Sequence, residues 1–82
     1  MPTWLGKVVL SDVFNDESMP FEAKRDEIAK RIRAAEWFDE DDYDLVEIVD
    51  ELAQTETLSE FDAVWASFYD WADDNRIWVE TF

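Results

Sequence analysis

Three segments of the chain carry apolar residues at the spacing of an α-helix, and this pattern constrains the fold more than any other feature. The segments span about 20–38, 42–54 and 59–73. Within each segment, apolar residues recur at steps of three and four, which places them on one face of a helix. The sequence therefore predicts three amphipathic helices around a shared core. The expected core positions are Phe21, Ile28, Ile32 and Ala35 in the first segment, Leu45, Ile48, Val49 and Leu52 in the second, and Phe61, Val64, Trp65, Phe68 and Ala72 in the third.

The expected helix starts carry recognisable signals. Pro20 suits the first turn of a helix, where a missing N–H costs nothing. Thr57 is followed three residues later by Glu60, which is the pattern of a capping box, and Ser59 is a second candidate for that cap. Residues 11–18 are rich in turn-forming side chains, so we expect an irregular connection there with Phe14 turned toward the core.

Both ends of the chain predict short strands. Residues 4–10 are β-branched and aromatic, and residues 76–82 alternate in the manner of a strand. Gly6 indicates a bulge or a close backbone approach. An isolated strand is only marginally stable, so the two strands are expected to pair with each other against the helices. The prediction is a single α+β domain over residues 1–82, ordered β-α-α-α-β. The sequence leaves both parallel and antiparallel pairing open, and antiparallel pairing is slightly favoured by its higher frequency.

Charge is distributed very unevenly along the chain. Residues 34–75 contain no Lys or Arg and hold fifteen of the twenty-two acidic residues, so the net charge of −15 arises in this half. Such a charge repels nucleic acid and anionic membranes, and its natural counterparts are basic surfaces. High charge alone would favour disorder, but five Trp, six Phe and two Tyr at helical spacing indicate a folded core. Neither a signal peptide nor a membrane-spanning segment is predicted.

The composition argues against an enzyme. The chain has no His and no Cys, which removes the commonest general base and the best nucleophile. Its single glycine excludes a glycine-rich phosphate loop. One calcium-loop register exists, but it places Asp44 where glycine is needed and Tyr43 where an oxygen ligand is usual. We therefore expect no catalysis, no cofactor and no dedicated metal site.

The candidate binding site is an acidic turn followed by an acidic helix face. In the second predicted helix, Asp44, Glu47 and Glu51 form a row of like charges at steps of three and four, which weakens the helix slightly. Because such a row of like charges lowers the stability of the helix, its role is expected to be either solubility or binding. Carboxylates at this spacing resemble the phosphates of DNA, which basic grooves bind. The site residues are Asp39, Glu40, Asp41, Asp42, Asp44, Glu47, Asp50 and Glu51.

The five basic residues of the first helix are expected to act as counter-charges for this acidic half. A different class of function uses apolar surface instead. Exposed Trp and Tyr side chains anchor many protein interfaces, and a patch of them could bind a partner or close a homodimer. The residues of this alternative aromatic patch are Tyr69, Trp71, Trp78 and Phe82.

Two stretches carry a resemblance to a known group of proteins. Residues 7–37, which include KVVLSDVFND and FEAKRDEIAKRIRAAEW, and residues 60–82, EFDAVWASFYDWADDNRIWVETF, resemble a family of short acidic proteins of actinobacterial phages. That family has no assigned activity, so the resemblance implies no functional residues. It implies a setting in the cytoplasm of an infected bacterium, with a host protein as the partner. A DNA-binding host protein inhibited by DNA mimicry is the form that we expect.

Overall fold

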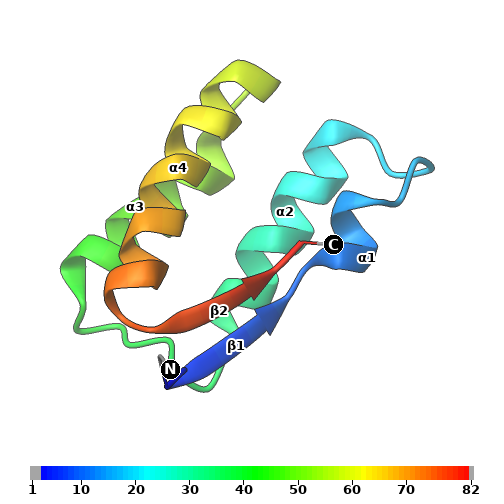
Figure 1. The fold of residues 1–82 in the computed structure, drawn as a ribbon. Coiled ribbons are helices and arrows are strands. Elements are labelled where there is room, and N and C mark those ends of the chain that lie inside the picture. Colours follow the sequence, from blue (N-terminus) through cyan, green and yellow to red (C-terminus); the bar gives the residue numbers. More distant parts are fainter. Residues whose placement is uncertain (1–2, 82) are drawn as a thin grey trace.

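The computed structural model describes residues 3–81 and contains six elements in the order β1, α1, α2, α3, α4, β2 (Figure 1). The helices are α1 (Ser11–Phe14), α2 (Phe21–Arg33), α3 (Tyr43–Gln54) and α4 (Leu58–Asp74), and the strands are β1 (Gly6–Val9) and β2 (Ile77–Glu80). The α+β class and the pairing of the two terminal strands are confirmed. The short α1 lies where we expected only irregular structure, because one helical turn is too short to produce a periodic pattern.

The two strands pair in parallel, with Gly6 opposite Ile77 and Val9 opposite Glu80, so the antiparallel prediction was wrong. The physical reason lies in the number of helices. Figure 1 shows that each long element reverses the direction of the one before it, since short connections join antiparallel neighbours. After three long helices the chain again runs in the direction of β1. The frequency of antiparallel pairs was therefore a poorer guide than the helix count.

The core is one cluster drawn from every element. The predicted helical stripes supply most of it: Phe68, Ile28, Ile32, Leu45, Leu52 and Val49 are fully buried. Leu10 and Val13 join them from the end of β1 and from α1, and Val8, Ile77 and Val79 from the inner face of the sheet. Phe14, Ile48, Val64 and Trp65 are partly buried against this cluster. Ala29 is buried although it was not predicted, whereas Ala35 lies half-buried in the turn after α2.

The helix starts follow the sequence signals to within one residue, but the first helix ends at Arg33 and not at about residue 38 as predicted. Pro20 is the N-cap of α2, and the side chain of Asp42 caps α3 by accepting from the N–H of Leu45 at 3.2 Å. Thr57, not Ser59, caps α4, because its hydroxyl accepts from the N–H of Glu60 at 3.2 Å. The Glu60 carboxylate in turn accepts from the N–H of Glu56 at 2.9 Å, so both ends of the box hold a backbone donor.

The predicted close approach at Gly6 is made by Trp37. A Cβ on residue 6 would collide with the indole of Trp37, including Cγ at 2.9 Å. The Trp37 ring nitrogen donates to the carbonyl of Lys7 at 3.1 Å, and Arg31 donates to the carbonyl of Val9 at 3.2 Å. Alternate residues of a parallel strand turn their backbone groups to opposite sides, so both carbonyls lie on the edge of β1 away from β2. Side chains thereby donate hydrogen bonds to the carbonyls on the edge of β1 that pairs with no other described strand.

Candidate protein-binding face

The acidic turn before α3 is held by its own carboxylates. Asp39 accepts from the N–H of Asp41 at 2.9 Å through its side chain and from the N–H of Asp42 at 3.1 Å through its backbone carbonyl. Asp42 caps α3. Two of the four turn carboxylates therefore shape the chain, and the side chains of Glu40 and Asp41 remain exposed without such a role. The turn presents fewer free carboxylates than its sequence indicates.

The row on α3 faces a groove between α3 and α4. Leu45, Val49 and Leu52 bury the opposite side of α3 and so fix the orientation of the row. The groove is open to solvent, and α4 contributes an indole and a further carboxylate to it. Its lining residues are Asp44, Glu47, Ile48, Glu51, Ser67, Trp71 and Asp74.

The α3–α4 groove combines an aromatic wall with acidic rims. Trp71 is half-buried, packing on Phe68 at 6.2 Å and on Trp37 at 5.7 Å between ring centroids. A wall held in this way keeps its place when a ligand enters. Lysine and arginine side chains bind carboxylates and also lie against indole faces. The sequence did not identify Asp74 as part of this site, because it is the antiparallel packing of α3 and α4 that brings the end of α4 beside the start of α3.

Asp50 differs from the other predicted site residues, because it points to α2 and forms an ion pair with Arg33 at 2.8 Å. Among residues 3–81, none of the other seven predicted carboxylates has an ion pair within 4 Å. The remaining cations of α2 do not reach them. Arg25 donates to the carbonyl of Thr55 at 2.7 Å and pairs with its neighbour Asp26. The expected counter-charge role of α2 thus holds for Arg33 alone.

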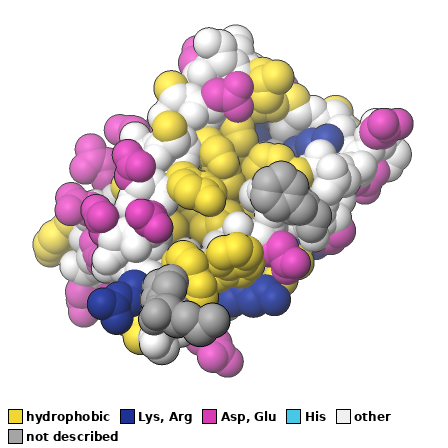
Figure 2. All heavy atoms as spheres, viewed as in Figure 1, with side chains coloured by type: hydrophobic (Ala, Val, Ile, Leu, Met, Phe, Trp, Pro, Cys, Tyr) yellow, Lys and Arg dark blue, Asp and Glu magenta, His cyan; other side chains and the backbone are white. Residues whose placement is uncertain are grey.

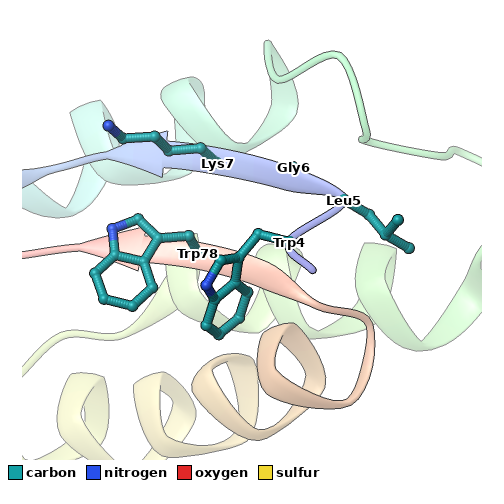
Figure 3. A pocket seen from close by; sticks show the side chains of 5 residues that line it. All are labelled: Trp4, Leu5, Gly6, Lys7 and Trp78. Atoms are coloured by element: carbon teal, nitrogen blue, oxygen red, sulfur yellow. The ribbon is translucent and has the colours of Figure 1, made fainter. Parts of the chain in front are cut away.

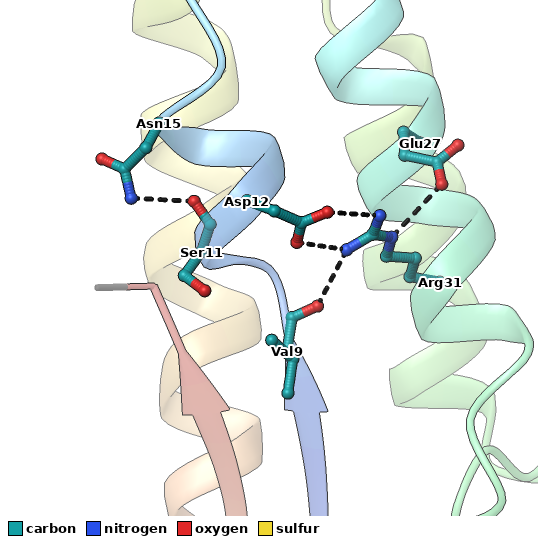
Figure 4. A network of polar contacts seen from close by, with 6 residues as sticks. All are labelled: Val9, Ser11, Asp12, Asn15, Glu27 and Arg31. Atoms are coloured by element: carbon teal, nitrogen blue, oxygen red, sulfur yellow. Dashed lines mark hydrogen bonds and ion pairs between the residues drawn. The ribbon is translucent and has the colours of Figure 1, made fainter.

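Arg31 joins the N-terminal elements instead (Figure 4). Its guanidinium binds both oxygens of Asp12, at 2.6 and 2.8 Å, and also binds Glu27 at 3.2 Å. The hydrogen bonds from Arg31 hold the pKa of Asp12 below its ordinary value of 3.8. A hydrogen bond from the Ser18 hydroxyl lowers the pKa of Asp16 in the same way. The contact of Arg31 with Asp12 ties α1 to α2, and Arg31 leaves the charge of the α3–α4 groove uncompensated.

The alternative aromatic patch is only partly brought together. Tyr69 and Trp78 are exposed and line one small hollow together with Trp4. Trp71 lies on the other side of α4, in the α3–α4 groove, and Phe82 lies outside the described residues. Trp4 was not predicted as a member. Strand alternation could not have found it, because β1 begins only at Gly6.

Figure 2 shows acidic side chains gathered on the side where α3 and α4 lie, with apolar side chains over and beside the sheet in the middle of the view. Within residues 3–81, no group of three or more carboxylates is placed to hold a metal ion. In the same range, no helix is both long enough and apolar enough to cross a membrane.

Comparisons with protein-family models, with curated proteins and with solved structures find no match to the chain. The resemblance to the actinobacterial phage family therefore stays a prediction, and only the residues of the candidate sites bear on function.

Proposed function

We propose that the chain is a non-catalytic phage protein that binds a basic surface of a host protein in the cytoplasm of the infected bacterium. The observation that carries the proposal is the α3–α4 groove, where Asp44, Glu47 and Glu51 face the groove without an ion pair. Each like-charged pair in this row lowers helix stability by a few tenths of a kcal/mol. A row that costs stability and stays unpaired is best explained by a cationic ligand.

The partner that fits best is a protein whose basic surface otherwise binds DNA. Neighbouring carboxylates of such a row lie about 5–6 Å apart at Cβ. The row continues along the groove, because Glu51 also borders a second hollow with Glu60. A basic groove that meets the regularly spaced phosphates of a strand can meet this row with the same Lys and Arg side chains. The chain would then act as a DNA mimic that inhibits its target.

The test is affinity capture from an actinobacterial lysate on the immobilised chain, followed by competition with duplex DNA. Glu47→Gln/Glu51→Gln removes two charges from the groove. Glu17→Gln/Glu22→Gln removes two exposed glutamates elsewhere and is the matched control. We expect the groove variant to weaken capture at least about tenfold and the control to change it little. Duplex DNA should displace the captured protein.

Salt provides the second readout. Raising salt from about 0.1 M to about 1 M shortens the Debye length from about 10 Å to about 3 Å, so capture through the groove should fall steeply. Capture that survives high salt would exclude an electrostatic interface. Equal losses in the groove variant and its control would show that only total charge matters. A partner that binds in low salt but is not displaced by DNA would support the acidic interface and contradict the proposal of DNA mimicry.

A further inference from the structure

The outer face of the sheet is an apolar surface that no described element covers. Because paired residues of a parallel sheet point to the same side, Val8 and Val79 face the helices while Lys7 and Trp78 face outward. Parallel sheets occur almost only where both faces are covered. Here the outward residues stay exposed, Trp78 by 44% and Val9 by 42%. Residues 3–81 therefore leave one face of a parallel pair open, which is unusual.

Exposed apolar side chains are concentrated on this face. Among residues 3–81, seven large apolar side chains are exposed, and all but Tyr43 and Leu58 lie on the sheet or beside it. Trp4 and Trp78 pack edge to face with ring centroids 5.1 Å apart, and Figure 3 shows the two indoles side by side on the same side of the strands. We call this surface the sheet patch, and its residues are Trp4, Leu5, Val9, Tyr69 and Trp78.

The charges around the sheet patch balance, in contrast to the rest of the chain. Lys7 lines the patch and pairs with Glu80 at 3.6 Å. Arg76 lies beside Leu5, whose N–H donates to the Arg76 carbonyl at 2.7 Å, and Asp73 borders the hollow under Trp78. Around the patch there are thus two cations and two carboxylates, of which Lys7 and Glu80 form an ion pair, in a molecule whose net charge is −15. A strongly basic or strongly acidic partner would find no complementary field here.

From these observations we infer that a second copy of the chain covers the sheet patch and forms a two-fold dimer. In a two-fold interface the same surface meets itself, so it must be self-complementary. The sheet patch meets this condition, because the ion pair of Lys7 on β1 and Glu80 on β2 lies beside its two tryptophans. Lys7 of each copy can pair with Glu80 of the other copy. The carboxylates of the α3–α4 groove are on the far side of α4, where Trp71 and Asp74 face α3, so the two copies meet without opposing these acidic grooves.

The dimer leaves both α3–α4 grooves open and is independent of the proposed function. The salt dependence of dimer formation has the opposite sign to that of binding a basic partner. Two copies of a chain of charge −15 repel each other, and salt screens that repulsion, so self-association should tighten as salt rises. Binding of a basic partner weakens under the same change. Failure of one proposal is therefore distinguishable from failure of the other.

Sedimentation equilibrium of the whole chain tests the inference, from low micromolar to near-millimolar concentration and at about 0.1 M and about 1 M salt. We expect a monomer–dimer equilibrium that shifts toward dimer in high salt. Trp78→Ser should raise the dimer Kd at least about thirtyfold, as removal of a hot-spot tryptophan does. The matched control is Tyr43→Ser, which removes the most exposed of the large apolar side chains, on the acidic side, and should leave Kd unchanged.

A charge exchange keeps the test informative if Trp78→Ser also weakens the fold. Lys7→Glu changes an exposed side chain and should raise Kd, because two carboxylates then meet across the axis. Adding Glu80→Lys should restore the dimer. A monomer at every concentration and both salts would overturn the inference. A dimer that ignores Trp78→Ser and Lys7→Glu, or that Tyr43→Ser disrupts equally, would overturn it as well, because its interface would lie elsewhere.

Discussion

Gly6→Ala should destabilise the protein, although the same change usually stabilises a strand. Glycine in a strand costs conformational entropy, so alanine normally gains about 0.4–1 kcal/mol where the backbone conformation allows it. The backbone allows it here, since Gly6 does not have a positive φ. The new methyl group would however collide with the Trp37 indole and would lie 3.0 Å from Cδ1 of Ile77. The sign of the effect therefore depends on whether Trp37 can move.

Trp37 cannot move freely, because two contacts hold it. Its ring nitrogen donates to the Lys7 carbonyl at 3.1 Å, and its ring packs on Trp71, which packs on the fully buried Phe68. Overpacking costs about 1–3 kcal/mol. Loss of the hydrogen bond adds about 1 kcal/mol. After subtraction of the glycine gain, the free energy of unfolding should fall by about 2 kcal/mol, which lowers Tm by about 8–16 °C in a chain of this size.

Urea denaturation followed by far-ultraviolet circular dichroism measures this change. Lys7→Ala, at the next position with an exposed side chain, is the control and should shift the midpoint little. The decisive comparison is a double-mutant cycle with Trp37→Ala, run in sucrose so that all four proteins fold. Without the indole, Gly6→Ala should become neutral or slightly stabilising. A neutral effect in the presence of Trp37, or the same loss in its absence, would refute the steric argument.

Four smaller changes test other parts of the structure. Thr57→Ala removes the cap of α4 and should cost about 1 kcal/mol in urea denaturation, whereas Ser59→Ala should cost little; equal effects would contradict the cap assignment. Arg76 has a φ of 58°, so Arg76→Gly should raise the free energy of unfolding by about 0.5–1 kcal/mol in thermal melts, while Arg76→Ala should bring no gain. Hydrogen bonds from Arg31 lower the pKa of Asp12, so the folded state favours the ionised carboxylate. The resulting stabilisation is fully present at a pH above 3.8, the ordinary pKa of aspartate, and is lost as the pH falls below that value. Asp12→Asn should therefore flatten the acid limb of a plot of stability against pH, and an unchanged limb would exclude the pair as its cause. Glu47→Gln should raise Tm slightly at low salt but not at high salt, and a fall at low salt would contradict the like-charge row.

The sequence predicted the three long helices well because each of them buries a stripe that neighbouring turns define. Ile28 and Ile32, or Leu45 and Leu52, reveal their helices by local spacing alone. Contacts between distant segments are not encoded in this way. Nothing near Asp50 indicates that Arg33 neutralises it, and nothing near Trp71 indicates that it faces α3 in an acidic groove, on the other side of α4 from Trp78. The candidate site was therefore found as a stretch of sequence, and the packing of α2 and α4 against α3 selects the members that face the α3–α4 groove.

Gly6 of β1 pairs with Ile77 of β2, and all four helices lie between these two strands in the sequence. Synthesis therefore makes β1 first and its partner last. The helices have local contacts that can form while the chain grows, whereas closure of the sheet must wait until residues 77–80 have been made. Until then Val8 and Leu10 lack the partner strand that borders them in the folded chain. Folding should accordingly begin with the α3–α4 hairpin and end with strand docking as the slow step. Any nascent chain halted before residue 77 would carry an unpaired apolar strand, which could aggregate or bind a chaperone.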